Sequence, residues 1–511
     1  MHYNRLAGDL RYYFINLFIY FQLRKKTAHI LPHICNMKTT KINGKDLLAA
    51  GYAEGKILGI ALGLLDNNYK ELEAATVINL FKDVKSNPEA FLDDPVLEEL
   101  ATKIIEHANG PADKTIVLKT NPSAYAVYGE ASIDKGARDQ MNVAMSLPVA
   151  VAGALMPDAH QGYGLPIGGV LATKGVVIPY GVGVDIGCAM TLSIFDIPGE
   201  HFNENHAKFK RELIAHTKFG AGQGFQHGYK SEHEVLDDPT FNITHFIRQL
   251  KDKAYAQLGT SGGGNHFVEW GTIEFEEKDT SLGIEKGNYV ALLSHSGSRG
   301  MGATIAGYYT RLAKQLCKLP QKASNLAYLD LNSAEGQEYW LAMNLAGEYA
   351  AASHEVIHKK LANAIGGQKL ITIANHHNFA WKEQWNGEEV IVHRKGATPA
   401  AKGVMGFIPG SMAAPGFLVR GKGAENALQS ASHGAGRAMS RTAASNNITG
   451  AQLSDVLKEN KVTLIGGGRD EAPMAYKDIN MVMDAQRDLV DVVAKFTPRI
   501  VRMADDGSKE D

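Results

Sequence analysis

The spacing of apolar side chains along the chain predicts helices first and strands afterwards. Residues 45–64 and 70–84 carry apolar side chains at helical intervals, and Pro88 and Pro95 interrupt the pattern. We therefore expect a small helical region near the start of the chain.

From Thr115 onwards the pattern changes to short β-type runs divided by glycine and proline. The predicted strands are Ile116–Leu118, Gly168–Ala172, Val176–Ile178, Tyr289–Leu293, Leu370–Ala374, Glu389–His393 and Val462–Ile465. Longer apolar stretches at helical spacing predict helices at Ala303–Lys318, Gly336–Ala364 and Ile479–Lys495. No internal repeat or low-complexity linker divides these elements. We expect one large catalytic domain of the α+β or mixed α/β class after the helical region.

Composition narrows the class of protein. The 511 residues are 44% apolar, enough for a large core, and the formal net charge is -2. No overall field attracts nucleic acid, so a polyanion would need a local basic groove. The three cysteines are too few and too scattered for a disulfide framework, which predicts a reducing compartment and a cytoplasmic protein.

The first residues carry an apolar stretch, Tyr12–Leu23, followed by the basic run Arg24–Lys26. The stretch is shorter than the roughly 20 residues that cross a bilayer, and a signal peptide carries its main charge before the apolar part. We expect no membrane association. Our hypothesis is that residues 1–36 are a non-native or disordered extension, and that Met37 begins the catalytic chain 37–511.

Five glycine-framed segments each present a side chain suited to metal binding or nucleophilic attack. Glycine lets such turns approach a ligand closely, so their side chains can converge on one point. The pattern suggests a metal-dependent enzyme. The segments are Gly183–Cys188, Gly262–His266, Leu293–Arg299, Asn375–Asn378 and Ser430–Arg437.

The individual signals differ in strength. A lone cysteine such as Cys188 is more often a small buried hydrophobe, but Asp185 three residues earlier and the later histidines favour a metal ligand. His295 follows a strand-like run. Of the adjacent pair His376 and His377, only one faces a given site on a strand, so the other is structural.

A competing motif lies at His354–His358, which matches the HExxH pattern of zinc proteases on an apparently helical segment. No second protease signature accompanies it, so we expect a solvated helix face. The chain also lacks a P-loop and the KxDG motif of lysine-based nucleotidyltransferases. If a nucleotide is activated covalently, His433 is the candidate nucleophile, with Arg437 and Arg441 nearby for phosphate.

Seven strings in order resemble the RtcB family of RNA-splicing ligases, and the likeness covers nearly all of residues 40–503. They are Met156–Gly164, Gly183–Cys188, Gly264–Glu269, His393–Thr398, Ile408–Met412, Ser432–Arg437 and Asp470–Lys477.

The resemblance implies GTP-dependent joining of RNA ends that bear a 3′-phosphate or 2′,3′-cyclic phosphate to 5′-hydroxyl ends, with two Mn²⁺ ions in an RtcB-like fold. It implies that His433 becomes guanylylated and that Cys188 bridges both ions. The implied metal ligands are Asp185, Cys188, His266, His295 and His377. The implied nucleotide pocket comprises Asn265, Glu269, Asn378, Pro409, Gly410, Ser411, Met412, His433, Gly434, Ala435 and Gly436.

Three positions depart from the family pattern. Ala189 stands where the family has a glycine, and Gly416 stands where it usually has a serine. The family's C-terminal lysine is replaced by Met503 in direct register, and Arg502 takes its place only after a shift of one residue. Guanine recognition is therefore expected to be weaker or altered.

We expect RNA phosphates to meet Arg299, Arg394, Lys395 and Arg437, and we expect a monomer. Two alternatives stay open at this point. One is a dinuclear metal phosphoesterase that hydrolyses RNA ends without GTP, and the other is a catalytically idle RNA-binding paralogue.

Overall fold

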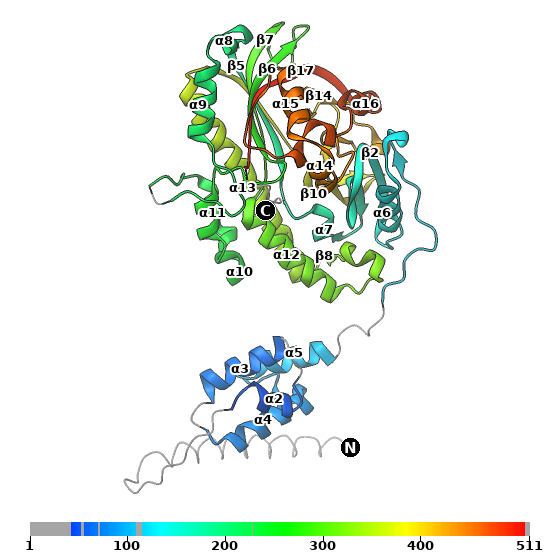
Figure 1. The fold of residues 1–511 in the computed structure, drawn as a ribbon. Coiled ribbons are helices and arrows are strands. Elements are labelled where there is room, and N and C mark those ends of the chain that lie inside the picture. The colour runs from blue at the N-terminus through cyan, green and yellow to red at the C-terminus, as the bar shows by residue number, and fades with distance from the viewer. Residues whose placement is uncertain (1–41, 53–55, 70–71, 109–114, 227, 506–511) are drawn as a thin grey trace. The chain divides into compact units, whose positions relative to one another are not determined.

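The computed structural model describes residues 42–52, 56–69, 72–108, 115–226 and 228–505. The chain divides between Asp113 and Lys114 into two compact units. Figure 1 shows a small helical unit and a larger unit that contains all the described sheets. The hypothesis about residues 1–36 falls outside the described residues.

The first unit is helical, as the sequence predicts. Its helices bury Leu47, Phe81 and Leu100 in a core of their own. Asn43 caps the first helix and exchanges hydrogen bonds with Asp46, which satisfies N–H groups that a helix start leaves open. The stretch 45–64 is divided between two helices instead of forming one. The helices are α2 Gly44–Ala49, α3 Lys56–Asn68, α4 Ala74–Ser86 and α5 Glu98–Ala108, with a short 3₁₀ turn at Pro88–Phe91.

Two sheets dominate the second unit. The eight-stranded sheet runs in the order β13 (Met405–Ile408), β14 (Gly416–Gly421), β17 (Val490–Met503), β6 (Phe267–Phe275), β7 (Gly287–Ser296), β5 (Ala189–Pro198) and β9 (Lys369–His376), with β16 (Thr463–Ile465) paired to β17. The five-stranded sheet runs in the order β1 (Ala126–Val127), β2 (Ala150–Tyr163), β3 (Leu165–Thr173), β11 (Glu388–Lys395) and β10 (Asn378–Trp385). Two short pairs complete the strands, β12 (Ala397–Pro399) with β15 (Ser430–Ser432) and β4 (Val176–Val177) with β8 (Leu329–Asp330). The mixed α/β class is therefore confirmed.

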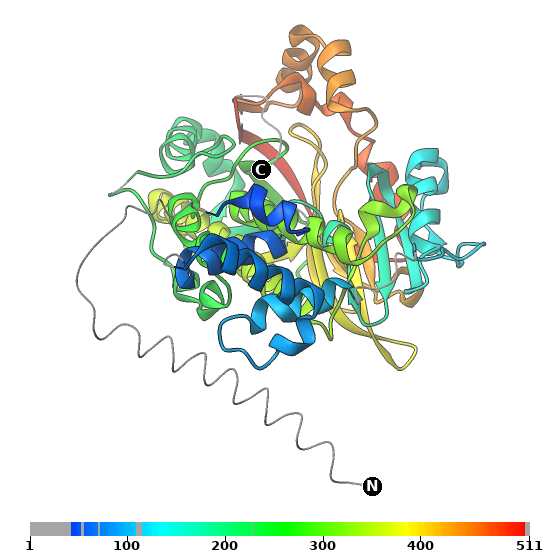
Figure 2. The same cartoon turned by 90° about the horizontal axis from the view of Figure 1, so that it is seen from below.

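Helices pack against these sheets. Phe209 of α9 (His206–His216) and Ile357 of α13 (Ala334–Ile365) join Trp270 of β6 in one buried cluster. In Figure 2, α14 and α15 (orange) stand to one side of the strands. The helices of this unit are α6 Lys135–Met145, α7 Pro179–Val182, α8 Gly199–Glu204, α9 His206–His216, α10 His245–Arg248, α11 Lys251–Gln257, α12 Arg299–Leu316, α13 Ala334–Ile365, α14 Arg441–Asn447, α15 Gly450–Glu459 and α16 Ile479–Asp484.

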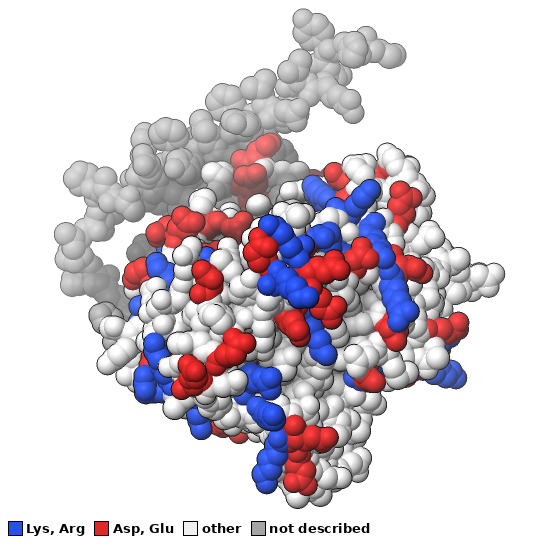
Figure 3. Space-filling view, turned by 90° about the horizontal axis from the view of Figure 1, so that it is seen from above, with Lys and Arg blue, Asp and Glu red and all other residues white. Residues whose placement is uncertain are grey.

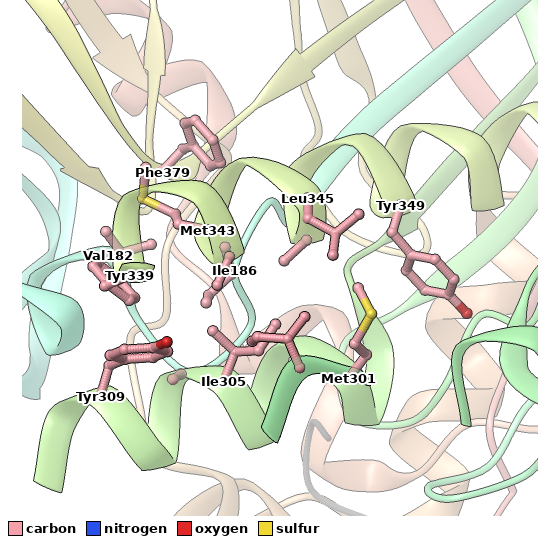
Figure 4. Close-up of a cluster of buried hydrophobic side chains, with 14 of the residues drawn as sticks. Val182, Ile186, Met301, Ile305, Tyr309, Tyr339, Met343, Leu345, Tyr349 and Phe379 are labelled. Atoms are coloured by element: carbon pink, nitrogen blue, oxygen red, sulfur yellow. The ribbon is translucent and has the colours of Figure 1, made fainter. Parts of the chain in front are cut away.

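The core between α12 and α13 fixes a turn that matters for function. Figure 4 shows Ile305 of α12 and Met343 of α13 on either side of Ile186, which comes from the turn before β5. All three side chains are fully buried. Burying an aliphatic side chain of this size stabilises a fold by about 1.5–3 kcal/mol, so Ile186 anchors its turn to the two helices.

Two predicted elements are wrong in part. Ile116–Leu118 forms no strand, although the Ile116 N–H is bonded to the Lys318 carbonyl. The predicted helix Ile479–Lys495 ends at Asp484, and β17 begins at Val490. No helix in the described parts of the chain has the length and apolar character needed to cross a membrane.

Candidate metal centre and active site

Five predicted metal-binding side chains meet at one end of the eight-stranded sheet. His266 precedes β6, His295 lies near the end of β7, Cys188 precedes β5 and His377 follows β9. These four strands are adjacent, and the register pairs Ala189 of β5 with both Ser296 and His376. Residues far apart in the sequence therefore become neighbours through strand pairing.

The ligand atoms form a continuous chain of short contacts around the cysteine. Cys188 Sγ lies 3.1 Å from His295 Nε2 and 3.5 Å from His266 Nε2. His266 Nε2 is 3.0 Å from Asp185 Oδ2, and His295 Nε2 is 3.2 Å from His377 Nε2. The sulfur thus separates an Asp185–His266 pair from a His295–His377 pair. Among the residues that the structure describes, Cys188, His266 and His295 bring their ligand atoms close enough to one another to hold a metal ion.

Two glycines give the turn that carries Asp185 and Cys188 the space it needs: Gly187 within the turn and Gly297 after β7. Gly187 has a φ of +71°, and a side chain there would collide with the backbone of Gly347 in α13. A side chain on Gly297 would collide with the Asp185 carboxylate. Both glycines let backbone come close to the centre, as the glycine-framed pattern suggested.

Backbone carbonyls set the orientation of two imidazoles. His266 Nδ1 lies 2.7 Å from the Ser261 carbonyl, and His295 Nδ1 lies 3.1 Å from the Asn265 carbonyl. Each carbonyl accepts a hydrogen bond from Nδ1–H, which leaves the Nε2 lone pair directed at the cluster. Burial holds the pKa of His295 well below its usual range, and the nearby His266 lowers it further. A neutral imidazole is the form that binds metal.

Two buried polar atoms at the centre have no hydrogen-bond partner within the described part of the chain. They are Asp185 Oδ1 and His377 Nδ1. Burial by itself would raise the pKa of Asp185, but its close contact with His266 and the charge of Arg299 lower it below its usual value. The carboxylate is thus ionised in a buried position, where a bound cation would offset its desolvation.

His376 and His377 divide as expected for neighbours on a strand. His377 reaches the cluster, whereas His376 Nδ1 is 2.8 Å from the Gly187 carbonyl and its ring stacks on Phe379. The prediction that one of the two is structural is confirmed.

His433 lies beside the metal-type cluster. Its ring centroid is 5.1 Å from that of His377, and its Nδ1 is 2.6 Å from Asp158 Oδ2. Asp158 is fully buried and also accepts the His433 backbone N–H at 3.2 Å. Burial would raise the pKa of Asp158, but the hydrogen bond from His433 and the charge of Lys477 lower it. The carboxylate therefore orients the imidazole and directs its Nε2 away from Asp158.

A cavity of about 500 Å³ opens between the two sheets at this point. Ten of the eleven residues implied for a nucleotide pocket line it, whereas Asn378 does not. The Asn378 side chain instead accepts the Gly396 N–H at 2.8 Å. The ten are Asn265, Glu269, Pro409, Gly410, Ser411, Met412, His433, Gly434, Ala435 and Gly436.

Two polar groups in this cavity are poised for a ligand. Asn265 Oδ1 is buried and has no hydrogen-bond partner in the described segments. Glu269 is 4% exposed, and burial raises its pKa well above the usual value. Such unpaired groups in a concave site are typical of ligand recognition.

The C-terminal strand shows which of Met503 and Arg502 occupies the position next to the cavity where the family has a lysine. Met503 lines the cavity, whereas Arg502 points away and donates to carbonyls of Leu213 (3.1 Å) and Ile214 (2.6 Å). Successive side chains of a strand point to opposite faces, so Met503 faces the cavity and Arg502 faces away from it. The direct register, with Met503 in place of the lysine, therefore fits the structure. Gly416 also lines the cavity, and a side chain there would collide with Phe407.

The HExxH motif forms a buried polar network, so the expectation of a solvated helix face is wrong. Ser294 Oγ lies 2.6 Å from His354 Nδ1 and 2.8 Å from His358 Nε2. His354 Nε2 is 3.1 Å from the Ser296 carbonyl, and His358 Nδ1 is 2.8 Å from Ser193 Oγ. Every ring nitrogen has a protein partner, which leaves none for zinc.

The basic residues predicted to meet RNA phosphates are largely committed to protein partners. Arg299 and Arg394 are each 1% exposed, so their prediction as RNA contacts is wrong. Arg394 pairs with Glu383 through both terminal nitrogens, at 2.5 and 3.0 Å. Lys395 donates to backbone carbonyls. Arg437 lines the cavity but pairs with Glu471.

Comparison with known proteins identifies the family. The sequence model of a family described as "tRNA-splicing ligase RtcB" matches residues 140–504. The chain belongs to the RtcB family. An RNA-splicing ligase RtcB of Escherichia coli K12 is 35% identical over 377 residues, which are 66% of this chain and 87% of that relative. A tRNA-splicing ligase RtcB of Nanoarchaeum equitans is 30% identical over 426 residues, 70% of this chain and 89% of the relative. An RNA-splicing ligase RtcB of Mycobacterium bovis is 29% identical over 428 residues, 70% of this chain and 98% of the relative.

Sequence reasoning missed Asp158, the buried carboxylate that contacts His433. Asp158 appears in the matched string Met156–Gly164 but was not assigned a role. A carboxylate within an otherwise apolar strand was the available signal, because a buried charge needs a partner. Its partner, His433, lies 275 residues away along the chain.

Proposed function

We propose that this protein joins RNA 3′-phosphate or 2′,3′-cyclic phosphate ends to 5′-hydroxyl ends, using GTP and two Mn²⁺ ions, in the cytoplasm. Its membership of the RtcB family supports RNA joining. The observation that carries the proposal is the position of His433, held by buried Asp158 and adjacent to the Cys188 cluster through His377.

His433 has the arrangement of a nucleophile. Its Nδ1–H donates to Asp158 Oδ2, so the lone pair on Nε2 is free to attack the α-phosphorus of GTP. A phosphorus–nitrogen bond forms, the bond to the β-phosphate oxygen breaks, and pyrophosphate leaves. Asp158 stabilises the positive charge that the imidazole develops in this step.

The RNA steps regenerate the histidine. An oxygen of the RNA 3′-phosphate attacks the phosphorus on His433, and the phosphorus–nitrogen bond breaks. The 5′-hydroxyl oxygen then attacks the activated 3′-phosphorus, its proton passes to solvent, and GMP leaves. A cyclic phosphate end is first hydrolysed to the 3′-phosphate.

The residues at the centre fit two cations. The donor set combines a thiol, an ionised carboxylate and three imidazoles, and two of its buried atoms lack partners. Asp185, Cys188, His266, His295 and His377 would hold them. When bound, such ions supply positive charge that orients phosphate and stabilises the transition state. The thiol alone would favour a softer metal, so manganese rests on the family resemblance.

Glu269 and Asn265 are the proposed base-recognition groups. Guanine presents two adjacent N–H donors on one edge, and accepting both would favour the ionised Glu269 carboxylate, with its two acceptor oxygens, over the protonated form that burial favours. Met503 supplies only an apolar contact at the same cavity. We expect purine discrimination to depend on Glu269 and to be lower than a lysine at position 503 would give.

Covalent labelling tests the proposal. The protein is incubated with GTP or ATP radiolabelled at the α-phosphate, and then with a cleaved stem-loop RNA and Mn²⁺. We expect label on the wild type from GTP, no label on His433→Ala, and ligated RNA only when labelling occurs. RNA end hydrolysis without labelling would instead identify a phosphoesterase, and RNA binding without either would identify an idle paralogue.

A further inference from the structure

An exposed tyrosine, Tyr163, and a half-buried one, Tyr180, form an aromatic surface that lines the cavity. Tyr163 ends β2 at the turn into β3 and is 69% exposed, and Tyr180 lies in the short helix α7. Their ring centroids are 6.5 Å apart with an interplanar angle of 54°. Val184, 41% exposed, lines the same cavity. Large exposed aromatic side chains beside a reactive cavity are typical of binding surfaces.

A buried lysine holds this aromatic surface in place. Lys395 Nζ donates to the Tyr163 carbonyl at 2.6 Å and to the Tyr180 carbonyl at 3.2 Å. The same ammonium group lies 4.9 Å from the centroid of the Tyr180 ring. In contrast, neither tyrosine hydroxyl has a hydrogen-bond partner among the residues that the structure describes. The backbones are fixed while the rings remain available.

The aromatic surface and the proposed nucleophile are close neighbours. Gly396 directly follows Lys395, and a side chain on it would lie within 3.2 Å of the His433 ring. Tyr163 and Tyr180 belong to the β2–β3 hairpin and α7, whereas Glu269 and Met503 belong to the eight-stranded sheet. A nucleotide on His433 with its base near Glu269 would therefore leave the aromatic side of the cavity open.

We propose that Tyr163 and Tyr180 stack on a base of the RNA end whose phosphate approaches His433. This inference rests on the proposed function. Stacking on aromatic rings accepts any base, because every base has a π face, and it suits an enzyme that joins ends of differing sequence. The neutral rings would bind the base, and the phosphate would be bound by His433 and the metal-type cluster.

Variants of Tyr163 separate RNA binding from nucleotide chemistry. Tyr163→Ala removes the ring, and Tyr163→Phe is the matched control because it keeps the π face. Loss of stacking weakens binding by about 5- to 100-fold. We expect Tyr163→Ala to raise the KM for RNA by that factor, with GTP labelling of His433 unchanged, and Tyr163→Phe to behave as wild type.

A fluorescent base gives a second readout. RNA carrying 2-aminopurine as its terminal base is titrated with each protein in the absence of GTP. We expect strong quenching with wild type and Tyr163→Phe and much weaker quenching with Tyr163→Ala. Equal quenching by all three proteins, or an unchanged KM for RNA, would overturn the proposal.

The remaining outcomes are also decisive. A loss of GTP labelling in Tyr163→Ala without an effect on RNA would assign the aromatic surface to the nucleotide and overturn the inference. If the wild type neither labels nor ligates, the proposed function fails. The 2-aminopurine titration still decides whether the tyrosines bind a base.

Discussion

Two groups of buried histidines lie close together in this protein, and their hydrogen bonds distinguish them. His266 and His295 turn Nδ1 to backbone carbonyls and Nε2 to the sulfur of Cys188. His354 and His358 have both ring nitrogens occupied by serine hydroxyls or a carbonyl. In the first group, one nitrogen of each ring is available to bind a metal ion. In the second group, both nitrogens of each ring are already hydrogen-bonded. A familiar motif such as HExxH is therefore a poorer guide to metal binding than the partners of each nitrogen.

The largest effect is expected from replacing Cys188, which contacts the first group of histidines and not the second. Cys188→Ser should lose bound metal and reduce RNA ligation by more than the roughly 10- to 100-fold typical of removing an outer partner of a metal site. Metal content of the purified protein and ligation rate are the measurements. Cys317→Ser is the control, since Cys317 is also buried but lies outside the cluster. Equal metal content in both variants would contradict the assignment.

Removing the hydroxyl that serves two histidines should affect stability and not metal. Ser294→Ala leaves one nitrogen of His354 and one of His358 without a partner. Each unsatisfied buried group costs about 1–3 kcal/mol, so for two groups we expect a loss of roughly 2–6 kcal/mol in the free energy of unfolding. Ser193→Ala deprives one nitrogen of His358, and the other hydrogen bond that it removes is with the hydroxyl of the exposed Thr372, so it should cost about half as much. Urea denaturation measures the stability of both variants. Loss of metal from either one would contradict the distinction between the two histidine groups.

Acid should destabilise the protein through the second group of histidines, which are buried in the neutral form. Burial lowers the pKa of His354 to about 4, well below that of a histidine in the unfolded chain. The unfolded state therefore binds more protons between pH 6.5 and 4, and stability falls as pH falls through that window, by about 1.4 kcal/mol per pH unit for each such site. His393, buried with a pKa of about 4, adds to the slope. Unfolding curves at several pH values check this, and His354→Gln should reduce the slope.

The smallest expected effect concerns the histidine next to a ligand. His376→Phe loses one hydrogen bond to the Gly187 carbonyl, which is worth about 0.5–1.5 kcal/mol. Metal content should be retained, because His376 does not contact the cluster. His377→Phe is the paired variant and should lose metal. Similar metal loss in both would mean that the backbone between them, and not the side chain, sets the site.

Much of the site was predictable because its signals are local. Glycine-framed turns marked Cys188, His266, His295 and His377, and strand pairing then placed these turns at one edge of the sheet. The partners of Asp158 and His354 were not predictable in this way, since both depend on contacts between distant segments. Neither periodicity nor propensity reports such contacts.

The fold shows the same limit at the end of the chain. Ile479–Lys495 carries apolar residues at spacing compatible with a helix, but β17 begins at Val490 and pairs with β14 and β6. Tertiary pairing of β-branched residues overrides helical spacing there. The adjoining Gln486 side chain is buried and accepts the Ser432 N–H at 2.9 Å, which ties the segment to the site.

The most direct measurement is an anomalous difference map from crystals grown with Mn²⁺. We expect two peaks flanking Cys188 Sγ, one beside Asp185 and His266 and the other beside His295 and His377, with His433 at the edge of the second. Peaks at His354 and His358, or none near the Cys188 sulfur, would contradict the account.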